Sequence, residues 1–177
     1  MKRLLVYFAL IIAACLFAGI FGIIHDQITY TVSPEYYTKF KFRQFGLLDS
    51  PLPARLRAVQ VGFLASWWMG IPIGVLVGAV GFIHHGHRRM LQVTLRSFVV
   101  VVAFTLLVGL FGLTYGFFRT SSIELAKYQG WFIPPDVIDL RRYLCVGYMH
   151  NASYIGGALS IIVAWIYHVV VRFRNKE

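Results

Sequence analysis

Charged side chains are missing from four long apolar runs of this 177-residue chain, which has only seven acidic residues against 17 lysines and arginines. No Asp, Glu, Lys or Arg occurs within residues 4–24, 61–83, 98–118 or 148–171. A proton-coupled transporter or a voltage sensor needs an ionisable residue at membrane depth, so both functions are disfavoured. A small pore lined by glycine and serine stays an open alternative.

Cysteines and catalytic motifs are also scarce. Cys15 and Cys145 fall in different parts of the chain at different expected depths, so a disulfide between them is not expected. The sequence contains no phosphate-binding glycine loop, no recognisable catalytic triad and no HExxH-type metal motif. It also has no nucleic-acid-binding module. The net charge of +10 therefore points to anionic lipid head groups as partners, and not to nucleic acid.

Apolar side chains are what the sequence has in abundance. They make up 58% of the residues, and the mean hydropathy of +0.68 is too high for an ordinary soluble domain. Each apolar run has about the 20 residues that a helix needs to cross a membrane. We predict an all-α integral membrane protein, a four-transmembrane-helix bundle in one domain over residues 1–177. Short interfacial helices are expected in two outer loops, 25–60 and 119–147.

The basic residues set the expected orientation. Eight of them lie in short segments on one side of the four spans, whereas the nine in the two long loops are accompanied by six of the seven acids. Both termini are thus expected in the cytoplasm, in a multi-pass protein of a bacterial inner membrane. Residues 12–15 fit a lipoprotein cleavage box at Cys15, but the apolar run continues to Ile24. We therefore expect a retained first span.

The first outer loop contains a helix start signal. Ser33 is placed to cap a short helix over residues 34–44, with Pro34 at its first position, although alternating aromatic and basic residues leave a strand as the alternative. Such a segment suits the head-group layer of a membrane. The predicted ligands of lipid head groups are Lys39, Lys41 and Arg43 in this loop, with Arg88 and Arg89 on the cytoplasmic side.

Three further signals concern helix ends and bends. Ser121 and Glu124 have the spacing of a capping box and predict a short helix ending at Gly130. The residues 134–136, Pro-Pro-Asp, are a start signal for the fourth long helix. Pro72 lies inside the second span and should kink it.

Small residues recur at helical spacing in all four spans. In lipid, such residues let helix backbones approach closely and gain van der Waals contact, so we expect them to face one another or a partner chain. The glycines predicted to support this packing are Gly70, Gly74, Gly109, Gly112 and Gly157.

The pair His25-Asp26 follows the first span directly, and His150 is expected at about the same depth in the fourth. Together with Glu35 from the aromatic loop, these residues form a candidate metal site at the outer end of the bundle. Two imidazoles with carboxylates suit zinc, iron or manganese, and suit copper less well. The alternative is that His25, Asp26 and His150 only make structural hydrogen bonds.

Two functional hypotheses follow. The first is a membrane protein whose outer metal site serves metal binding or oxidative chemistry. The second is a non-catalytic subunit or assembly factor of a larger membrane complex, or a homo-oligomer, that docks through its small-residue faces. A minor alternative is a b-type haem protein in which His25 and His150 hold one haem and His84 or His85 with His168 another. Tight glycine packing disfavours haem.

Overall fold

The computed structural model describes residues 1–174, and this part of the chain is helical and contains no strand. Four helical segments are long and apolar enough to cross a membrane, as predicted. They are α1 (Lys2–Val32), the broken segment from Ala54 to Ile83, α6 (His87–Arg119) and α7 (Leu140–Arg174). The predicted all-α fold class with four candidate spans is therefore confirmed.

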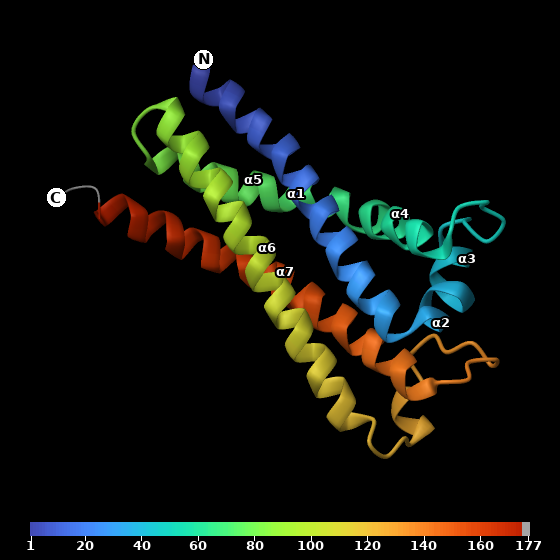
Figure 1. The fold of residues 1–177 in the computed structure, drawn as a ribbon. Coiled ribbons are helices and arrows are strands. Elements are labelled where there is room, and N and C mark those ends of the chain that lie inside the picture. Colours follow the sequence, from blue (N-terminus) through green and yellow to red (C-terminus); the bar gives the residue numbers. More distant parts are fainter. Residues whose placement is uncertain (175–177) are drawn as a thin grey trace.

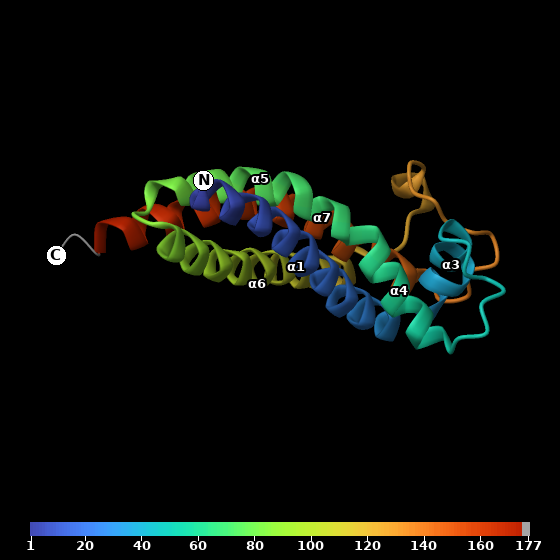
Figure 2. The same cartoon turned by 90° about the horizontal axis from the view of Figure 1, so that it is seen from above.

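The four long segments form an elongated bundle with two different ends (Figures 1 and 2). The N-terminus, the turn before α6 and the end of α7 lie at one end, which we call the termini end. The segments that join α1 to α4 and α6 to α7 lie at the other, which we call the loop end. An even number of long helices places both chain ends together.

The bundle consists of two helix pairs. The first pair is α1 with the broken segment, and the second is α6 with α7, which pack along each other. The pairs meet where α1 contacts α6 and where α5 contacts α7. Space between the two pairs therefore lies in the middle of the bundle, where the candidate site is found.

The second long segment is broken, as the proline inside it predicts. It consists of α4 (Ala54–Ser66), the 3₁₀ turn η2 (Trp67–Met69), α5 (Gly70–Val80) and the 3₁₀ turn η3 (Gly81–Ile83). Pro72 occupies the first turn of α5, where its missing N–H removes no bond within that helix. Its ring clashes with the carbonyl four residues earlier, at Trp68, so the break falls just before the proline.

The loop end contains the short helical segments predicted there, with differences in detail. Residues 34–44 form α2 (Pro34–Tyr36), the π-helical turn η1 (Tyr37–Lys41) and α3 (Phe42–Gln44), so the alternative of a strand is wrong. Ser33 is the N-cap residue of α2 as predicted, but its buried hydroxyl makes no capping hydrogen bond. Its backbone N–H donates to the Thr29 carbonyl of α1, and its own carbonyl accepts a hydrogen bond from the N–H of Tyr36.

The second connection departs further from the prediction. The expected helix ending at Gly130 is a single 3₁₀ turn, η4 (Leu125–Tyr128), because Ser121 bonds back to Phe118 and Glu124 pairs with Lys127 instead of forming a capping box. Likewise, α7 does not start at residues 134–136. Its N-cap is Asp139, whose carboxylate accepts a hydrogen bond from the backbone N–H of Arg142.

Four of the five glycines assigned to helix packing lie at close helix contacts. A Cβ atom at Gly70 would clash with the backbone of Cys15, and one at Gly74 would crowd Ala14 and Ile11. In the other pair, Gly109 lies against Ser153 and Gly112 against Ala152. The fifth glycine differs, because a Cβ at Gly157 would meet no atom within 4 Å. It lines a cavity, which explains why no neighbouring helix contacts it.

Candidate metal centre

His25 and Asp26 lie inside α1, not at its end. The apolar run stops at Ile24, but the helix continues to Val32 because the loop end covers it with aromatic side chains. Both residues are therefore buried, each only 4% exposed. A buried carboxylate is costly unless it is paired, so Asp26 needs a partner.

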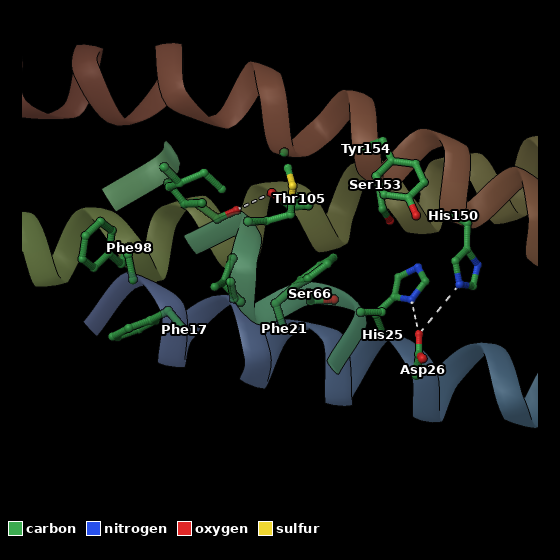
Figure 3. A pocket seen from close by; sticks show the side chains of 18 of the residues that line it. Phe17, Phe21, His25, Asp26, Ser66, Phe98, Thr105, His150, Ser153 and Tyr154 are labelled. Atoms are coloured by element: carbon green, nitrogen blue, oxygen red, sulfur yellow. Dashed lines mark hydrogen bonds and ion pairs between the residues drawn. The ribbon is translucent and has the colours of Figure 1, made fainter. Parts of the chain in front are cut away.

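The bundle brings His150 of α7 onto this pair (Figure 3). The imidazole rings of His25 and His150 meet edge to face, with their centroids 4.5 Å apart. Asp26 Oδ1 lies 3.0 Å from His25 Nδ1 and 3.8 Å from His150 Nε2. One ligand atom from each of the three residues lies within 4.8 Å of the others. Two ligands of one tetrahedral zinc ion are about 3.5 Å apart, so small rotations suffice to enclose an ion.

The hydrogen bonds at this cluster leave several of its acceptor atoms without a partner. His150 Nδ1 lies 3.0 Å from the Val146 carbonyl, which can only accept, so this nitrogen donates and Nε2 of the neutral ring has a free lone pair. When Asp26 is ionised, His25 Nδ1 donates to it, which frees the lone pair of His25 Nε2. That nitrogen and Asp26 Oδ2 are both buried without a partner among the described residues.

A histidine whose Nδ1 donates to a backbone carbonyl has the arrangement commonly seen at metal sites. The hydrogen bond sets the tautomer and holds the ring so that Nε2 faces the ion. The arrangement of His150 on Val146 is of this kind, and Asp26 gives His25 an equivalent orientation. A buried carboxylate between two imidazoles is an arrangement that a bound cation would satisfy.

Glu35, predicted as a fourth ligand, does not join the cluster. Its carboxylate accepts hydrogen bonds from the backbone N–H groups of Ile138 and Asp139 and pairs with Lys39 at 2.8 Å. The Lys39 ammonium, and then these two N–H groups, lower the pKa of Glu35 to about 2. Its role in this structure is to hold α2 to the start of α7, because the two segments meet at the loop end.

Lys41, predicted as a ligand of lipid head groups, is also placed differently. It is 8% exposed, donates to Gln44 at 3.0 Å and lines the same cavity as the His/Asp cluster. Burial lowers the pKa of Lys41 below its ordinary value, and the nearby Asp26 carboxylate offsets only part of this effect. The π-helical turn rotates its side chain inward, whereas Arg43 two residues later is exposed.

The other predicted head-group ligands lie at both ends of the bundle. Lys39 pairs with Glu35 and lies 3.5 Å from Asp136, so its charge is partly used within the loop end. Arg88 is exposed and Arg89 half-buried in the first turn of α6, at the termini end. Their binding to lipid stays a prediction.

Two tyrosines near the cluster were missed by sequence reasoning. Tyr36 packs on His150 with ring centroids 4.9 Å apart, and the Tyr37 hydroxyl bonds Thr29, one turn beyond Asp26. Burial raises the pKa of Tyr37, and the Asp26 carboxylate raises it further. The aromatic composition of the loop was visible, but it does not show that these rings fold back over the cluster.

A cavity of about 100 Å³ extends from the cluster toward the middle of the bundle (Figure 3). His25, Asp26, Lys41 and His150 lie at its polar end. The remaining lining comes from α1, α4, η2, α5, α6 and α7 and is mainly apolar, with Phe17, Phe21, Met69, Ile73, Phe98 and Val101 among its residues.

The histidines of the termini end form a separate hydrogen-bonded group. His84 Nε2 lies 3.0 Å from His168 Nδ1, and His168 Nε2 lies 3.2 Å from Ser97 Oγ. Burial lowers the pKa of His84, and the charges of Arg89 and Arg172 lower it further. In this pair, and in the pair of His25 and His150, the imidazoles touch directly, so no space for a porphyrin lies between them.

The fold and the site together define a small helical protein with four helices able to span a membrane and a His/Asp cluster that could hold a metal ion. Comparison of the chain with protein-family models, curated proteins and solved structures finds no match. Its function has to be inferred from the geometry of the site.

Proposed function

We propose that this chain is a multi-pass membrane protein that binds one divalent transition metal ion through His25, Asp26 and His150. The observation that carries the proposal is the convergence of His25, Asp26 and His150 in a buried position, with one possible ligand atom of each residue within 4.8 Å of the others. Buried polar atoms of this kind need a partner, and a cation supplies one for all three residues at once.

The ligand set favours iron, zinc or manganese. Two histidines and one carboxylate hold iron in non-haem oxygenases and zinc in several hydrolases, and both arrangements leave coordination positions open. The only cysteine near this end, Cys145, is buried against Thr120, so no thiolate supports cuprous copper. The open positions would face the cavity, where a metal-bound water or a bound molecule would be activated for hydrolytic or oxidative chemistry.

The placement of the centre follows from the proposed topology. With both termini in the cytoplasm, the loop end faces the extracytoplasmic side of a bacterial inner membrane. The His/Asp cluster would then lie toward the outer side of the membrane, beneath the loop end. Lys39 and Arg43 at the loop end, with Arg88 and Arg89 at the other, would contact anionic head groups.

The test is elemental analysis and an ultraviolet–visible spectrum of the detergent-purified protein. We expect near-stoichiometric iron, zinc or manganese, and its loss in the double variant His25→Ala, His150→Ala. The matched control replaces two histidines at the termini end that are outside the site, His85→Ala with His87→Ala, and should retain the metal. Wild-type protein that is metal-free and does not bind added metal would contradict the proposal.

The alternative of a non-catalytic subunit or assembly factor has less support. That hypothesis relied on small-residue faces that are available for docking, but Gly22 and Gly62 face each other, and Gly70 and Gly112 contact α1 and α7. These small-residue faces are already occupied by contacts between the two members of each helix pair. The surface left for a partner is the apolar outer face of the helices, which is suited to lipid equally well.

A further inference from the structure

The cavity beside the His/Asp cluster is long and narrow. It reaches from Asp26 to Ala14 along α1, twelve residues or about 18 Å at 1.5 Å per residue. The centre of a water-sized sphere can reach about 100 Å³ of this space, and with the radius of that sphere added, such a volume over that length has about the width of one extended hydrocarbon chain. A fused ring system or a pair of acyl chains would need a wider space.

The cavity has an apolar part and a polar end, as the labelled side chains show (Figure 3). Phe17 and Phe98 lie at the apolar end, whereas His25, Asp26 and His150 lie at the other. Ser153, 8% exposed, adds a buried hydroxyl without a partner among the described residues. An amphiphilic ligand would satisfy both parts, because a fully apolar one would leave these polar groups unpaired.

The cavity communicates with the outside of the bundle beside α7. Tyr154, which lines it, is 62% exposed, and Ser66 on α4 is half-buried. The space lies between the two helix pairs, which pack less extensively on each other than within each pair. If the helices span a membrane, this side faces lipid, so a membrane-dissolved amphiphile can enter without crossing water.

The charges at the polar end favour an anionic head group. Asp26 is the only carboxylate among the described residues that line the cavity, and it faces the Lys41 ammonium and the proposed divalent ion. Two positive charges on the metal and one on Lys41 exceed the single charge of Asp26 by two. Buried positive charge of this kind requires a counter-ion.

We infer that the cavity binds a single-chain lipid with an anionic oxygen head group, of the chemical class of a free fatty acid. Its chain would lie along Phe17, Phe21 and Phe98, and its carboxylate would face Lys41 and the open side of the metal centre. The metal ion matters here only through its charge. The choice of an anionic head group therefore rests on the proposed function, whereas the choice of a single hydrocarbon chain does not.

The test uses a palmitate analogue with a diazirine in its chain, photo-crosslinked to the full-length protein in detergent and mapped by mass spectrometry. We expect crosslinks on residues that line the cavity. Unlabelled palmitate should compete with them, and hexadecanol should compete at least tenfold less well than palmitate. Gly157→Phe should abolish them, because its side chain projects into the cavity. Ala158→Phe, exposed and one residue further on α7, should not. If Gly157→Phe folds poorly, Gly157→Leu replaces it.

The head group is tested separately. Lys41→Gln should weaken palmitate competition by about tenfold, as expected for loss of a charged hydrogen bond, while Lys2→Gln, exposed at the termini end, should leave it unchanged. The metal content of every variant is measured in the same samples. Specific crosslinking of metal-free protein would overturn the metal proposal alone. Crosslinks only on the outer helix faces, or equal competition by hexadecanol, would overturn the fatty-acid inference.

Discussion

At the scale of single residues, the environment decides what each side chain can do. Gly70 and Gly157 are both helical glycines on small-residue faces, yet one contacts a neighbouring backbone and the other faces a cavity. His150 and His168 are both histidines of α7, yet one leaves a free lone pair toward a carboxylate while the other is bonded at both nitrogens. Residue type alone does not distinguish the members of either pair.

The two glycines should respond in opposite ways to alanine. Gly70→Ala forces its methyl group against Cys15 and should lower the free energy of unfolding by about 1–3 kcal/mol. Gly157→Ala gains helix propensity without a clash and should raise it by about 0.5–1 kcal/mol. Thermal unfolding in detergent measures both. Equal destabilisation would mean that the α7 face at Gly157 is packed against protein.

At the scale of elements, the loop end is held by a contact between segments about a hundred residues apart in sequence. Glu35 of α2 accepts hydrogen bonds from Ile138 and Asp139 and so supports the start of α7, which in turn positions His150. This contact also keeps Tyr36 against His150. Glu35 therefore contributes to the metal centre by positioning an element, not by binding the ion.

The Glu35 contact should make the stability of the loop end depend on pH. The pKa of Glu35 in the folded protein is about 2, below its ordinary value of 4.5. Its stabilisation should therefore be complete above pH 4.5 and be lost as the pH falls toward 2. Glu35→Gln should cost about 1–2 kcal/mol at neutral pH and remove this part of the dependence.

Limited proteolysis of the 120–139 connection and thermal unfolding, each measured between pH 7 and pH 3, would test this expectation. The control is Glu124→Gln, because that carboxylate forms only an exposed pair with Lys127. If lowering the pH decreases the stability of Glu35→Gln as much as that of the wild type, groups other than Glu35 cause the pH dependence.

At the scale of the whole molecule, the two ends of the bundle differ in composition. The termini end contains Arg3, Arg88, Arg89 and Arg172, whereas the loop end contains most acids and the aromatic segment. The proposed orientation depends on this difference, and the metal centre and the fatty-acid cavity would open on the extracytoplasmic side if it holds.

Cysteine labelling of intact cells tests the orientation. Asp49→Cys, exposed at the loop end, should react with a membrane-impermeant maleimide, and Arg88→Cys, exposed at the termini end, only after permeabilisation. The native cysteines give little background because Cys145 is buried and Cys15 half-buried. The reversed pattern would place the metal centre on the cytoplasmic side.

The local features of the fold were predictable from sequence because they depend on neighbours in the chain. Run length and hydropathy were enough for the four long helices, and Pro72 for the break in the second. The adjacency of His25 and Asp26, and their depth relative to His150, were enough to propose the cluster. The helix start at Pro34 with Ser33 as its N-cap was predicted correctly, although the Ser33 side chain makes no capping hydrogen bond. The predicted starts at Ser121 and at residues 134–136 were wrong, because Ser121 bonds back to Phe118 and Asp139 caps α7 instead.

Only the tertiary structure decided which residues share the site. Helical periodicity shows which side chains lie on one face of one helix, but it does not show how that helix is rotated toward its neighbours. The rotation depends on the packing of the two helix pairs. Through it Lys41 turns into the cavity, Glu35 is taken by the start of α7, and Gly157 is left with open space. Chain composition determined the helices, and packing between them determined the site.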